Sequence, residues 1–255
     1  MSYQVICQDA LKYLKSRGAE SVQLVYIDPP FNRGYAHRNE DGEGYEDDYG
    51  PFQTYAQFLE PILQELHRVL TADGSLFFHL DWHWAAYAKV FLLDKIFGRE
   101  NCLNEIIWSY DYGGRPRKRW AQKHDTIYWY VKDRDNYTFN LEASDRIPYM
   151  APSLVGDEKA ARGKTPTDVW WNTIVPTNSK ERTGYPTQKP LSILERIVLV
   201  HSNPNDTVLD CFCGSGTTGV AAVKHGREAI LVDSNPTACE IAETRLQELT
   251  IESLT

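Results

Sequence analysis

Long hydrophobic runs are absent from the 255-residue sequence, and no stretch approaches the roughly 18 apolar residues that a membrane-spanning helix needs. Residues 1–8 are too polar for a signal peptide. Positive charge is in the minority, with 27 Lys and Arg against 35 Asp and Glu. The resulting net charge of −8 argues against a protein that coats nucleic acid generally, although it permits a local basic groove.

Cysteine is also scarce. The five cysteines form an odd number without paired spacing, at Cys7, Cys102, Cys211, Cys213 and Cys239. This pattern favours reduced thiols in a cytoplasmic protein over a disulfide framework.

Short β-rich runs alternate with helical patterns along the chain. The runs cover residues 22–27, 74–80, 105–109, 126–131, 207–210 and 229–232. The helical patterns cover residues 54–70, 82–97, 190–201, 217–225 and 236–249. This alternation predicts an α/β domain with a mostly parallel sheet flanked by helices.

Two segments interrupt that alternation. Residues 33–51 combine six acidic groups with four glycines and three tyrosines, which predicts a mobile, solvated surface loop. Residues 132–187 have little apolar periodicity and predict an irregular insert. We expect residues 1–134 and 184–255 to form the two halves of one domain, with residues 135–183 inserted between them.

A glycine-rich loop follows the run at 207–210. Gly214-Ser215-Gly216 opens a helical pattern, and glycine allows a backbone to turn tightly and approach a ligand. Asp233 ends the next β-rich run, where a carboxylate can accept both hydroxyls of a ribose. The loop lacks the full dinucleotide and nucleoside-triphosphate signatures, so a nucleoside without phosphates is favoured. A purely structural glycine turn is the alternative.

Asp28-Pro29-Pro30-Phe31 ends the run at 22–27. Two prolines stiffen the backbone and leave its carbonyls available, Asp28 adds a carboxylate acceptor, and Phe31 adds a flat face. Together these groups suit a planar ring with an exocyclic amino group. A Pro-Pro turn that merely ends a strand is the alternative.

With these motifs in order, the chain resembles the β-type (permuted) DNA amino-methyltransferases, which use S-adenosylmethionine to methylate adenine N6 or cytosine N4. The tetrapeptide precedes the glycine loop, as in that group. Further matching segments are Cys7-Gln8-Asp9-Ala10, Glu105-Ile106-Ile107-Trp108, Lys123-His124-Asp125 and Thr187-Gln188-Lys189-Pro190. The resemblance implies a Rossmann-like methyltransferase fold with a small target-recognition insert in residues 135–183.

The resemblance also implies residue roles. Asp28 and the Pro29 carbonyl would hold the target amino group, with Pro30 completing the turn and Phe31 stacking on a flipped base. Asp9 would lie near the cofactor's adenine, Asp233 would bind its ribose, and Lys189 would lie near its methionine carboxylate. The other implied cofactor residues are Asp210, Phe212, Gly214, Ser215, Gly216 and Thr217.

The sequence departs from the family pattern at three positions. Tyr185 stands where many members carry His, Asp233 replaces the commoner Glu, and Gln8 replaces Gly before Asp9. The Asp that heads the tetrapeptide resembles adenine-N6 enzymes, which favours adenine over cytosine as the methylated base. Methylation of RNA or of a protein glutamine is an alternative, and so is a non-catalytic DNA-binding module on the same fold.

A basic stretch between residues 113 and 123 predicts contacts to DNA phosphates. It contains Arg115, Arg117, Lys118, Arg119 and Lys123, with no acidic residue among them. Double-stranded DNA is therefore the expected partner, and the resemblance leaves a homodimer and a cognate restriction endonuclease open. The alternation His79, Asp81, His83 invites a metal site, but a strand end would not aim all three at one ion, so no metal is expected.

Overall fold

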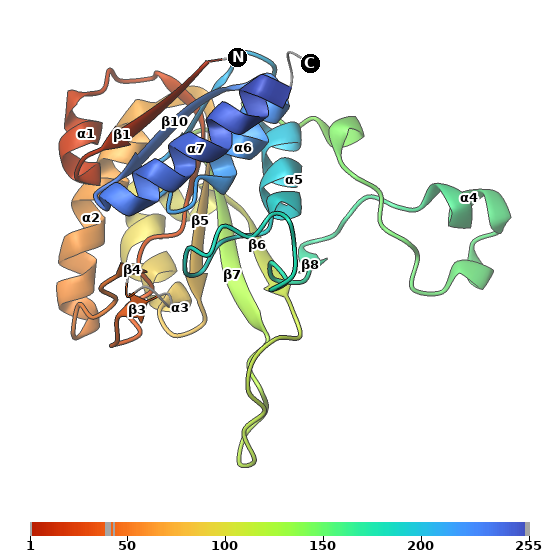
Figure 1. Cartoon of the computed structure of the whole chain (residues 1–255). Helices are drawn as coiled ribbons and strands as arrows, with labels where there is room; N and C mark the ends of the chain where they lie inside the picture. Colours follow the sequence, from red (N-terminus) through yellow and green to blue (C-terminus); the bar gives the residue numbers. More distant parts are fainter. Residues whose placement is uncertain (1, 39–41, 43, 253–255) are drawn as a thin grey trace.

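The computed structural model describes residues 2–38, 42 and 44–252. Its centre is an eight-stranded sheet (Figure 1). The strands, in the order in which they lie side by side, are β1 (Tyr3–Cys7), β10 (Glu228–Asp233), β9 (Thr207–Asp210), β2 (Val22–Ile27), β5 (Leu70–Asp81), β7 (His124–Val131), β6 (Cys102–Ser109) and β8 (Val169–Trp171). Among the described strands of this sheet, β7 alone runs opposite to the others, antiparallel to both β5 and β6. The predicted α/β class and mostly parallel sheet are confirmed.

Helices cover both faces of the sheet. One face packs against α1 (Ala10–Ser16), α2 (Phe52–Val69), α3 (Ala85–Ala88) and a π-helix, η1 (Lys89–Gly98). The other face packs against α5 (Leu191–His201), α6 (Thr217–Lys224) and α7 (Pro236–Glu252).

The central strand β2 shows why the sheet has two covered faces. Every residue of β2 is buried, and from Leu24 to Ile27 its side chains alternate between the two cores. Val25 and Ile27 point into the first core, whereas Leu24 and Tyr26 point into the second. A near-continuous apolar run is typical of a parallel strand with helices on both sides.

Most predicted elements are present, with shifted bounds. The helical pattern at 82–97 begins only at Ala85 and continues as the π-helix η1. β5 begins at Leu70, four residues before the predicted run at residue 74. The short elements β1, α1 and β8 were not predicted from the sequence pattern.

The acidic loop at 33–51 corrects an expectation. Most of its described residues are exposed, as expected, but the loop contains a two-stranded hairpin, β3 (His37–Arg38) and β4 (Gly44–Tyr45). Asp47 is fully buried, because its carboxylate accepts a hydrogen bond from the Asn32 N–H and lies 3.2 Å from Nε2 of His37. Glu40, Asp41 and Glu43 of this loop lie outside the described residues.

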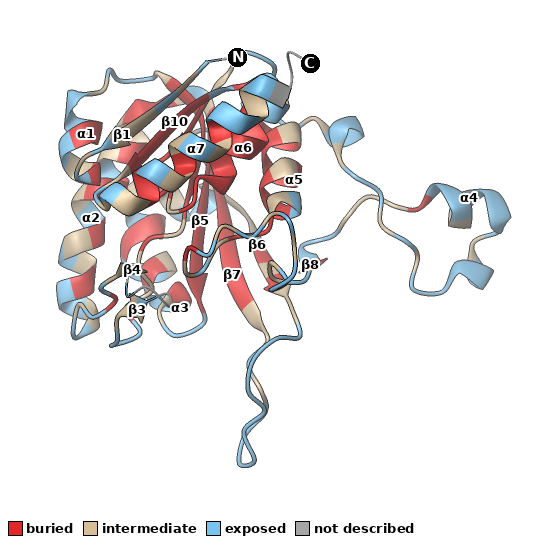
Figure 2. Cartoon of the chain, in the orientation of Figure 1, coloured by how far each residue is buried: buried red, intermediate tan, exposed pale blue. Residues whose placement is uncertain are grey.

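Two segments project from the domain (Figure 1). The connection between β6 and β7, residues 110–123, forms what we call the basic finger. Residues 146–164, which we call the arm, include α4 (Asp157–Arg162) and lie away from the sheet. Both segments are mostly exposed (Figure 2).

The predicted insert is not wholly separate from the sheet. It contributes β8, which pairs in parallel with β6 at the edge. At the base of the arm, Arg196 of α5 holds Asp145 with two hydrogen bonds of 2.8 and 2.7 Å. None of the helices that the structure describes has the length and apolar character needed to cross a membrane.

Candidate active site

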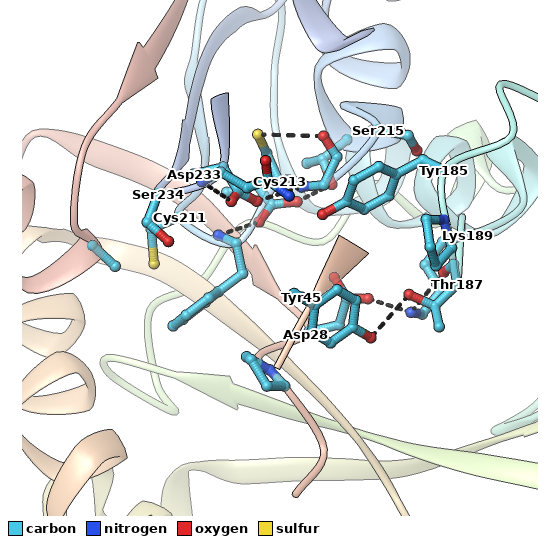
Figure 3. Close-up of a pocket in the computed structure, with 18 of the residues that line it drawn as sticks. Asp28, Tyr45, Tyr185, Thr187, Lys189, Cys211, Cys213, Ser215, Asp233 and Ser234 are labelled. Atoms are coloured by element: carbon cyan, nitrogen blue, oxygen red, sulfur yellow. Dashed lines mark hydrogen bonds and ion pairs between the residues drawn. The ribbon is translucent and has the colours of Figure 1, made fainter. Parts of the chain in front are cut away.

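A cavity of about 290 Å³ opens where β2, β9 and β10 end (Figure 3). β2 and β9 are neighbours, yet the chain leaves them in opposite directions, to β5 after β2 and to β10 after β9. In open α/β sheets such a reversal leaves a crevice at the carboxyl ends of the strands, where ligands bind. The fold therefore places the cavity where a ligand site is expected.

The structure brings most of the predicted site residues together at this cavity. Those that line it are Asp9, Asp28, Pro30, Lys189, Asp210, Phe212, Gly214, Ser215, Thr217 and Asp233. Pro29, Phe31 and Gly216 belong to the same turns but lie outside the cavity wall. The five basic residues of the finger lie outside it as well.

The turn after β9 is held by a buried carboxylate. Asp210 accepts hydrogen bonds from the Phe212 N–H at 3.0 Å and from the Thr218 hydroxyl at 2.6 Å. Burial, together with the charge of Asp28, raises the pKa of Asp210 well above its usual range. Gly216 ends the turn with φ +76°, and a Cβ there would lie 2.7 Å from the Cβ of Ala242. The close approach of α7 therefore requires glycine at this position.

Asp233 connects the turn to the end of β10. Its carboxylate accepts the N–H of Gly214 at 2.9 Å and the N–H of Asn235 at 2.9 Å. Burial raises the pKa of Asp233, and the nearby Asp28 charge raises it further. The ring of Tyr185 lies against Gly214, where an added Cβ would come within 3.1 Å of Cε1. Tyr185 is thus a wall of the cavity, a placement that its departure from the family pattern did not predict.

The Asp-Pro-Pro-Phe turn is clamped from two sides. The Tyr55 hydroxyl of α2 donates to the Pro30 carbonyl at 2.5 Å. Asn32 follows with φ +56°, and its side chain donates to the Gly50 carbonyl at 2.8 Å and accepts from the Tyr49 N–H at 2.7 Å. These bonds fix the tetrapeptide, so that Asp28 faces the cavity.

Lys189 forms an ion pair with Asp28. Its ammonium also donates to the Thr187 carbonyl at 3.2 Å and lies 5.3 Å from the ring centroid of Phe31. Lys189, which the resemblance places near a cofactor carboxylate, thus lies in the cavity wall and contacts the tetrapeptide. Figure 3 shows Lys189 and Thr187 on the same side of the cavity as Asp28 and Tyr45.

Behind Phe31 lies a buried chain of hydrogen bonds that no sequence pattern indicated. The Tyr26 hydroxyl lies 2.8 Å from Nδ1 of His79, and Nε2 of His79 lies 3.3 Å from a carboxylate oxygen of Asp125. Tyr110 donates to the other oxygen of Asp125 at 3.1 Å. Burial acts to raise the pKa of Asp125, but the hydrogen bond and charge of His79 outweigh it, so this pKa is lowered. The Phe31 ring centroid lies 5.4 Å from that of His79.

The hairpin β3–β4 borders the same cavity. The Tyr45 hydroxyl lies 3.1 Å from the Thr187 hydroxyl, and Asn235 donates to the Gly44 carbonyl at 2.9 Å. Burial raises the pKa of Tyr45, so its hydroxyl is protonated at neutral pH. The hairpin therefore connects the segment before α5 with the segment after β10 across the cavity.

The cavity wall is strongly acidic. Lys189 is the single basic side chain among its described lining residues, against the five carboxylates Asp9, Asp28, Glu46, Asp210 and Asp233. These carboxylates favour a ligand that carries positive charge, although the raised pKa of Asp210 and the pairing of Asp28 with Lys189 reduce the negative charge of the wall. Lys189 offers a cation to an anionic group of a ligand.

The basic finger is exposed, and its cations differ in their partners. Arg115 pairs with Asp111 at 2.7 Å, and Lys123 donates to the Gly113 carbonyl at 2.7 Å. Arg117, Lys118 and Arg119 make no hydrogen bond or ion pair with the part of the chain that the structure describes. These three cations are available to an anionic partner.

The residues of the rejected metal site have other partners. His79 belongs to the chain behind Phe31, and Asp81 binds Arg33 at 2.9 Å and His83 at 2.9 Å. Over the described ranges, no group of His, Cys, Asp and Glu side chains is arranged to hold a metal ion.

The geometry defines an α/β domain with one cavity bordered by the glycine turn and by the Asp-Pro-Pro-Phe turn, which we call the acceptor turn because its carboxylate and carbonyls can accept hydrogen bonds. The model of the DNA methylase family matches residues 22–244. The chain therefore belongs to this family and is a DNA methyltransferase of the N6-adenine/N4-cytosine group.

Two curated relatives match most of the chain. It is 32% identical to the type II methyltransferase M.HpaI of Haemophilus parainfluenzae, over 96% of this chain and 74% of that protein. It is 33% identical to the DNA adenine methyltransferase YhdJ of Escherichia coli strain K12, over 95% of this chain and 82% of that protein.

Solved structures share the fold at lower identity. The cytosine-N4-specific PvuII DNA methyltransferase superposes with a TM-score of 0.70 and 16% identity, over 98% of this chain and 90% of that one. TTHA0409 of Thermus thermophilus, a putative DNA modification methylase complexed with S-adenosyl-L-methionine, gives a TM-score of 0.65 and 22% identity, over 97% and 94%. The Rossmann-like methyltransferase fold is confirmed.

Proposed function

We propose that this DNA methyltransferase moves the methyl group of S-adenosylmethionine to the exocyclic N6 of adenine in duplex DNA. The observation that carries the proposal is the meeting of the Asp28 turn with the glycine turn at one cavity. The first offers acceptors for an amino group, and the second offers backbone and carboxylate contacts for a nucleoside. β2 and β9 pair directly, with Leu24 opposite Val208, so the two turns are held side by side.

The cavity fits this cofactor by charge. Five carboxylates surround the space and suit the cofactor's sulfonium and amine, while Lys189 suits its carboxylate. Asp233 would accept the ribose hydroxyls, and Asp9, at the start of α1, would lie by the adenine. When bound, the cofactor supplies a methyl group on a positively charged sulfur.

The residues of the tetrapeptide would activate the target nitrogen. The Asp28 carboxylate and the Pro29 carbonyl accept its two N–H groups, which draws the nitrogen lone pair out of conjugation with the ring. The base must leave the duplex to reach them, and Phe31 offers it a stacking face. The nitrogen would then take the methyl group that the cofactor supplies, the electron pair of the broken carbon–sulfur bond would remain on sulfur, and the nitrogen would release one proton to solvent.

Direct attack by the base nitrogen needs no protein nucleophile. Burial raises the pKa of Cys211 and of Cys213 well above the usual range, so both are neutral thiols at physiological pH. A thiolate is the nucleophilic form of cysteine, which makes these residues structural.

Duplex DNA would be held by the basic finger. Arg117, Lys118 and Arg119 offer cations without partners among the described residues, and phosphate contacts of this kind position a protein on DNA without reading its sequence. The finger begins at Tyr110, which contacts Asp125 behind Phe31, so the base of the finger lies near the acceptor turn. We place sequence recognition in residues 135–183.

Cytosine N4 is the second candidate base. It presents an amino group beside a ring nitrogen, as adenine does, and the acceptors of the Asp28 turn serve either. The adenine assignment is supported by the Asp at the head of the tetrapeptide and by the relative named as a DNA adenine methyltransferase. The cytosine alternative is supported by the fold shared with the cytosine-N4-specific PvuII enzyme.

A methyl-transfer assay tests the proposal. Unmethylated genomic DNA is incubated with enzyme and cofactor, digested to nucleosides and analysed by mass spectrometry. N6-methyladenine is expected from the wild type, and none from Asp28→Ala. N4-methylcytosine would retain the mechanism and overturn the choice of base. Absence of both modified bases, despite measured cofactor binding, would contradict the proposed function.

A further inference from the structure

The Lys189 ammonium occupies the place that the proposed function gives to the target base. Its nitrogen donates to the Asp28 carboxylate and lies over the ring of Phe31, 5.3 Å from the centroid. The proposed function assigns the Asp28 contact to the amino group of the base and the Phe31 face to its ring, so Lys189 overlaps the place of both. The side chains of Lys189 and Asp28 are only 10% and 16% exposed, so the pair is largely shielded from water.

The backbone holds Lys189 in this place. Thr187 adopts φ +59°, a conformation that is unfavourable for a β-branched residue and that needs support from its surroundings. Its carbonyl accepts from the Lys189 ammonium at 3.2 Å, and its hydroxyl contacts the Tyr45 hydroxyl. The ion pair is thus part of a fixed arrangement that spans the cavity.

A base amino group and the Lys189 ammonium therefore compete for Asp28. The Lys189 ammonium bonds one oxygen of Asp28 and also lies over the ring of Phe31, where the base would stack, so it must move before the base can enter. Once displaced, it needs another anion, because an unpaired buried charge is costly. The acidic side chains of the cavity wall are present with or without a ligand, whereas the cofactor brings an additional carboxylate when it binds. Lys189 is the one cation among the described residues of the wall that can receive it.

We propose that Lys189 couples the cofactor to the target base by exchanging partners: its ammonium pairs with Asp28 in the free enzyme and moves to the cofactor carboxylate on binding, which releases Asp28 for the amino group. This inference rests on the proposed function. Lys189 is a positioning residue here, since it controls when Asp28 is available and takes no part in bond formation. By linkage, cofactor and target base then favour each other's binding.

The exchange predicts that loss of an active-site side chain strengthens ligand binding. In the free enzyme the Asp28 carboxylate competes with the ligand's carboxylate for the Lys189 ammonium. Asp28→Asn removes that competition, so it should tighten the binding of a ligand that carries the cofactor's carboxylate. Two ligands separate the contributions: S-adenosylhomocysteine, and its decarboxylated form, which keeps the amine and lacks the carboxylate. The charge of Asp28 also affects the ligand directly, without Lys189. The change in affinity caused by Asp28→Asn must therefore be measured both with Lys189 present and in a Lys189→Met background.

The test is a double-mutant cycle by titration calorimetry on wild type, Asp28→Asn, Lys189→Met and the double variant. With Lys189 present, Asp28→Asn should tighten S-adenosylhomocysteine about tenfold more than in the Lys189→Met background, which is about 1.4 kcal/mol of coupling. The decarboxylated ligand should show less than a twofold coupling, and its retained binding shows that each variant is folded.

Equal effects of Asp28→Asn in both backgrounds would overturn the exchange. A coupling of the same size for the decarboxylated ligand would overturn it too, since the carboxylate would then have no part. If no form of the protein binds S-adenosylhomocysteine, the proposed function fails, and that result is distinct from either of these.

Discussion

The backbone N–H of Gly214, in the turn after β9, donates a 2.9 Å hydrogen bond to Oδ2 of Asp233 at the end of β10. One carboxylate thus holds the glycine turn and faces the cavity. Asp233 can hold the glycine turn and bind a ligand at the same time only if its carboxylate has acceptor positions left. A carboxylate offers about four lone-pair positions, and the Gly214 and Asn235 N–H groups take two of them.

Asp233→Ala should therefore weaken S-adenosylmethionine binding about 10- to 100-fold, because charge-assisted hydrogen bonds to the ribose are lost. Calorimetry of the purified protein measures this. Glu240→Ala, at an exposed position on α7, is the matched loss of one acidic side chain and should leave the affinity unchanged. Unaltered affinity in Asp233→Ala would show that the ribose lies elsewhere.

Arg117→Ala combined with Arg119→Ala should flatten the salt dependence of DNA binding. Each phosphate contact contributes about 0.9 to the slope of log affinity against log salt, so the slope should fall by about 1.8. Arg115→Ala is the matched control, because Asp111 already pairs with Arg115 at 2.7 Å. Fluorescence anisotropy between about 50 and 200 mM salt measures the slopes, and an unchanged slope would place the phosphate contacts outside the finger.

Gly216→Ala and Gly226→Ala form a second matched pair. Both glycines have φ +76°, but an added Cβ meets Ala242 at 2.7 Å at position 216 and nothing within 4 Å at position 226. Gly226→Ala should cost about 1 to 2 kcal/mol of unfolding free energy, and Gly216→Ala about 2 to 5 kcal/mol. Urea unfolding followed by circular dichroism checks the difference. Equal costs would mean that α7 moves aside freely.

Asp125→Asn should change how stability depends on pH. The pKa of Asp125 is lowered in the folded protein, so its charged form stabilises the fold above the ordinary pKa, and this contribution is lost as pH falls through the lowered value. The unfolding free energy of the wild type should exceed that of the variant by about 1 to 3 kcal/mol at pH 7, and by progressively less below about pH 4. Unfolding free energies measured from about pH 7 to about pH 3 give this difference.

The exposed change Asp135→Asn controls for the loss of one negative charge. A difference between wild type and Asp125→Asn that stays constant over the whole acidic range would contradict the lowered pKa. It would also mean that the hydrogen bonds of His79 and Tyr110 do not favour the charged form of Asp125.

Much of the site was predictable because its motifs follow buried strands directly. Asp28 comes straight after the apolar run of β2, and Asp210 ends the apolar run of β9, so both had to lie at the carboxyl edge of a parallel sheet. What these residues contact there was not predictable from the sequence pattern. The Lys189–Asp28 pair joins positions 161 residues apart, and its register depends on the whole path of the chain between them.

The acidic loop at 33–51 also shows what the sequence pattern does not predict, for a different reason. Acidic residues with glycine between them usually lie on the surface, and composition alone favours a solvated loop. Asp47 is nevertheless buried, because the Asn32 N–H and His37 supply partners for its carboxylate. The short strand β8 was missed because its three residues have no periodicity of their own, and pairing with β6 defines it.

The direct pairing of β2 with β9 has a consequence for how such enzymes diversify. The spacing between the acceptor turn and the glycine turn is set by backbone hydrogen bonds around Leu24 and Val208, and not by the long chain that connects them. Insertions, deletions or exchange of the arm therefore leave the reacting groups in place. With sequence recognition placed in residues 135–183, as proposed above, a new DNA target would require changes in that segment and none in the pairing that sets the spacing of the two turns.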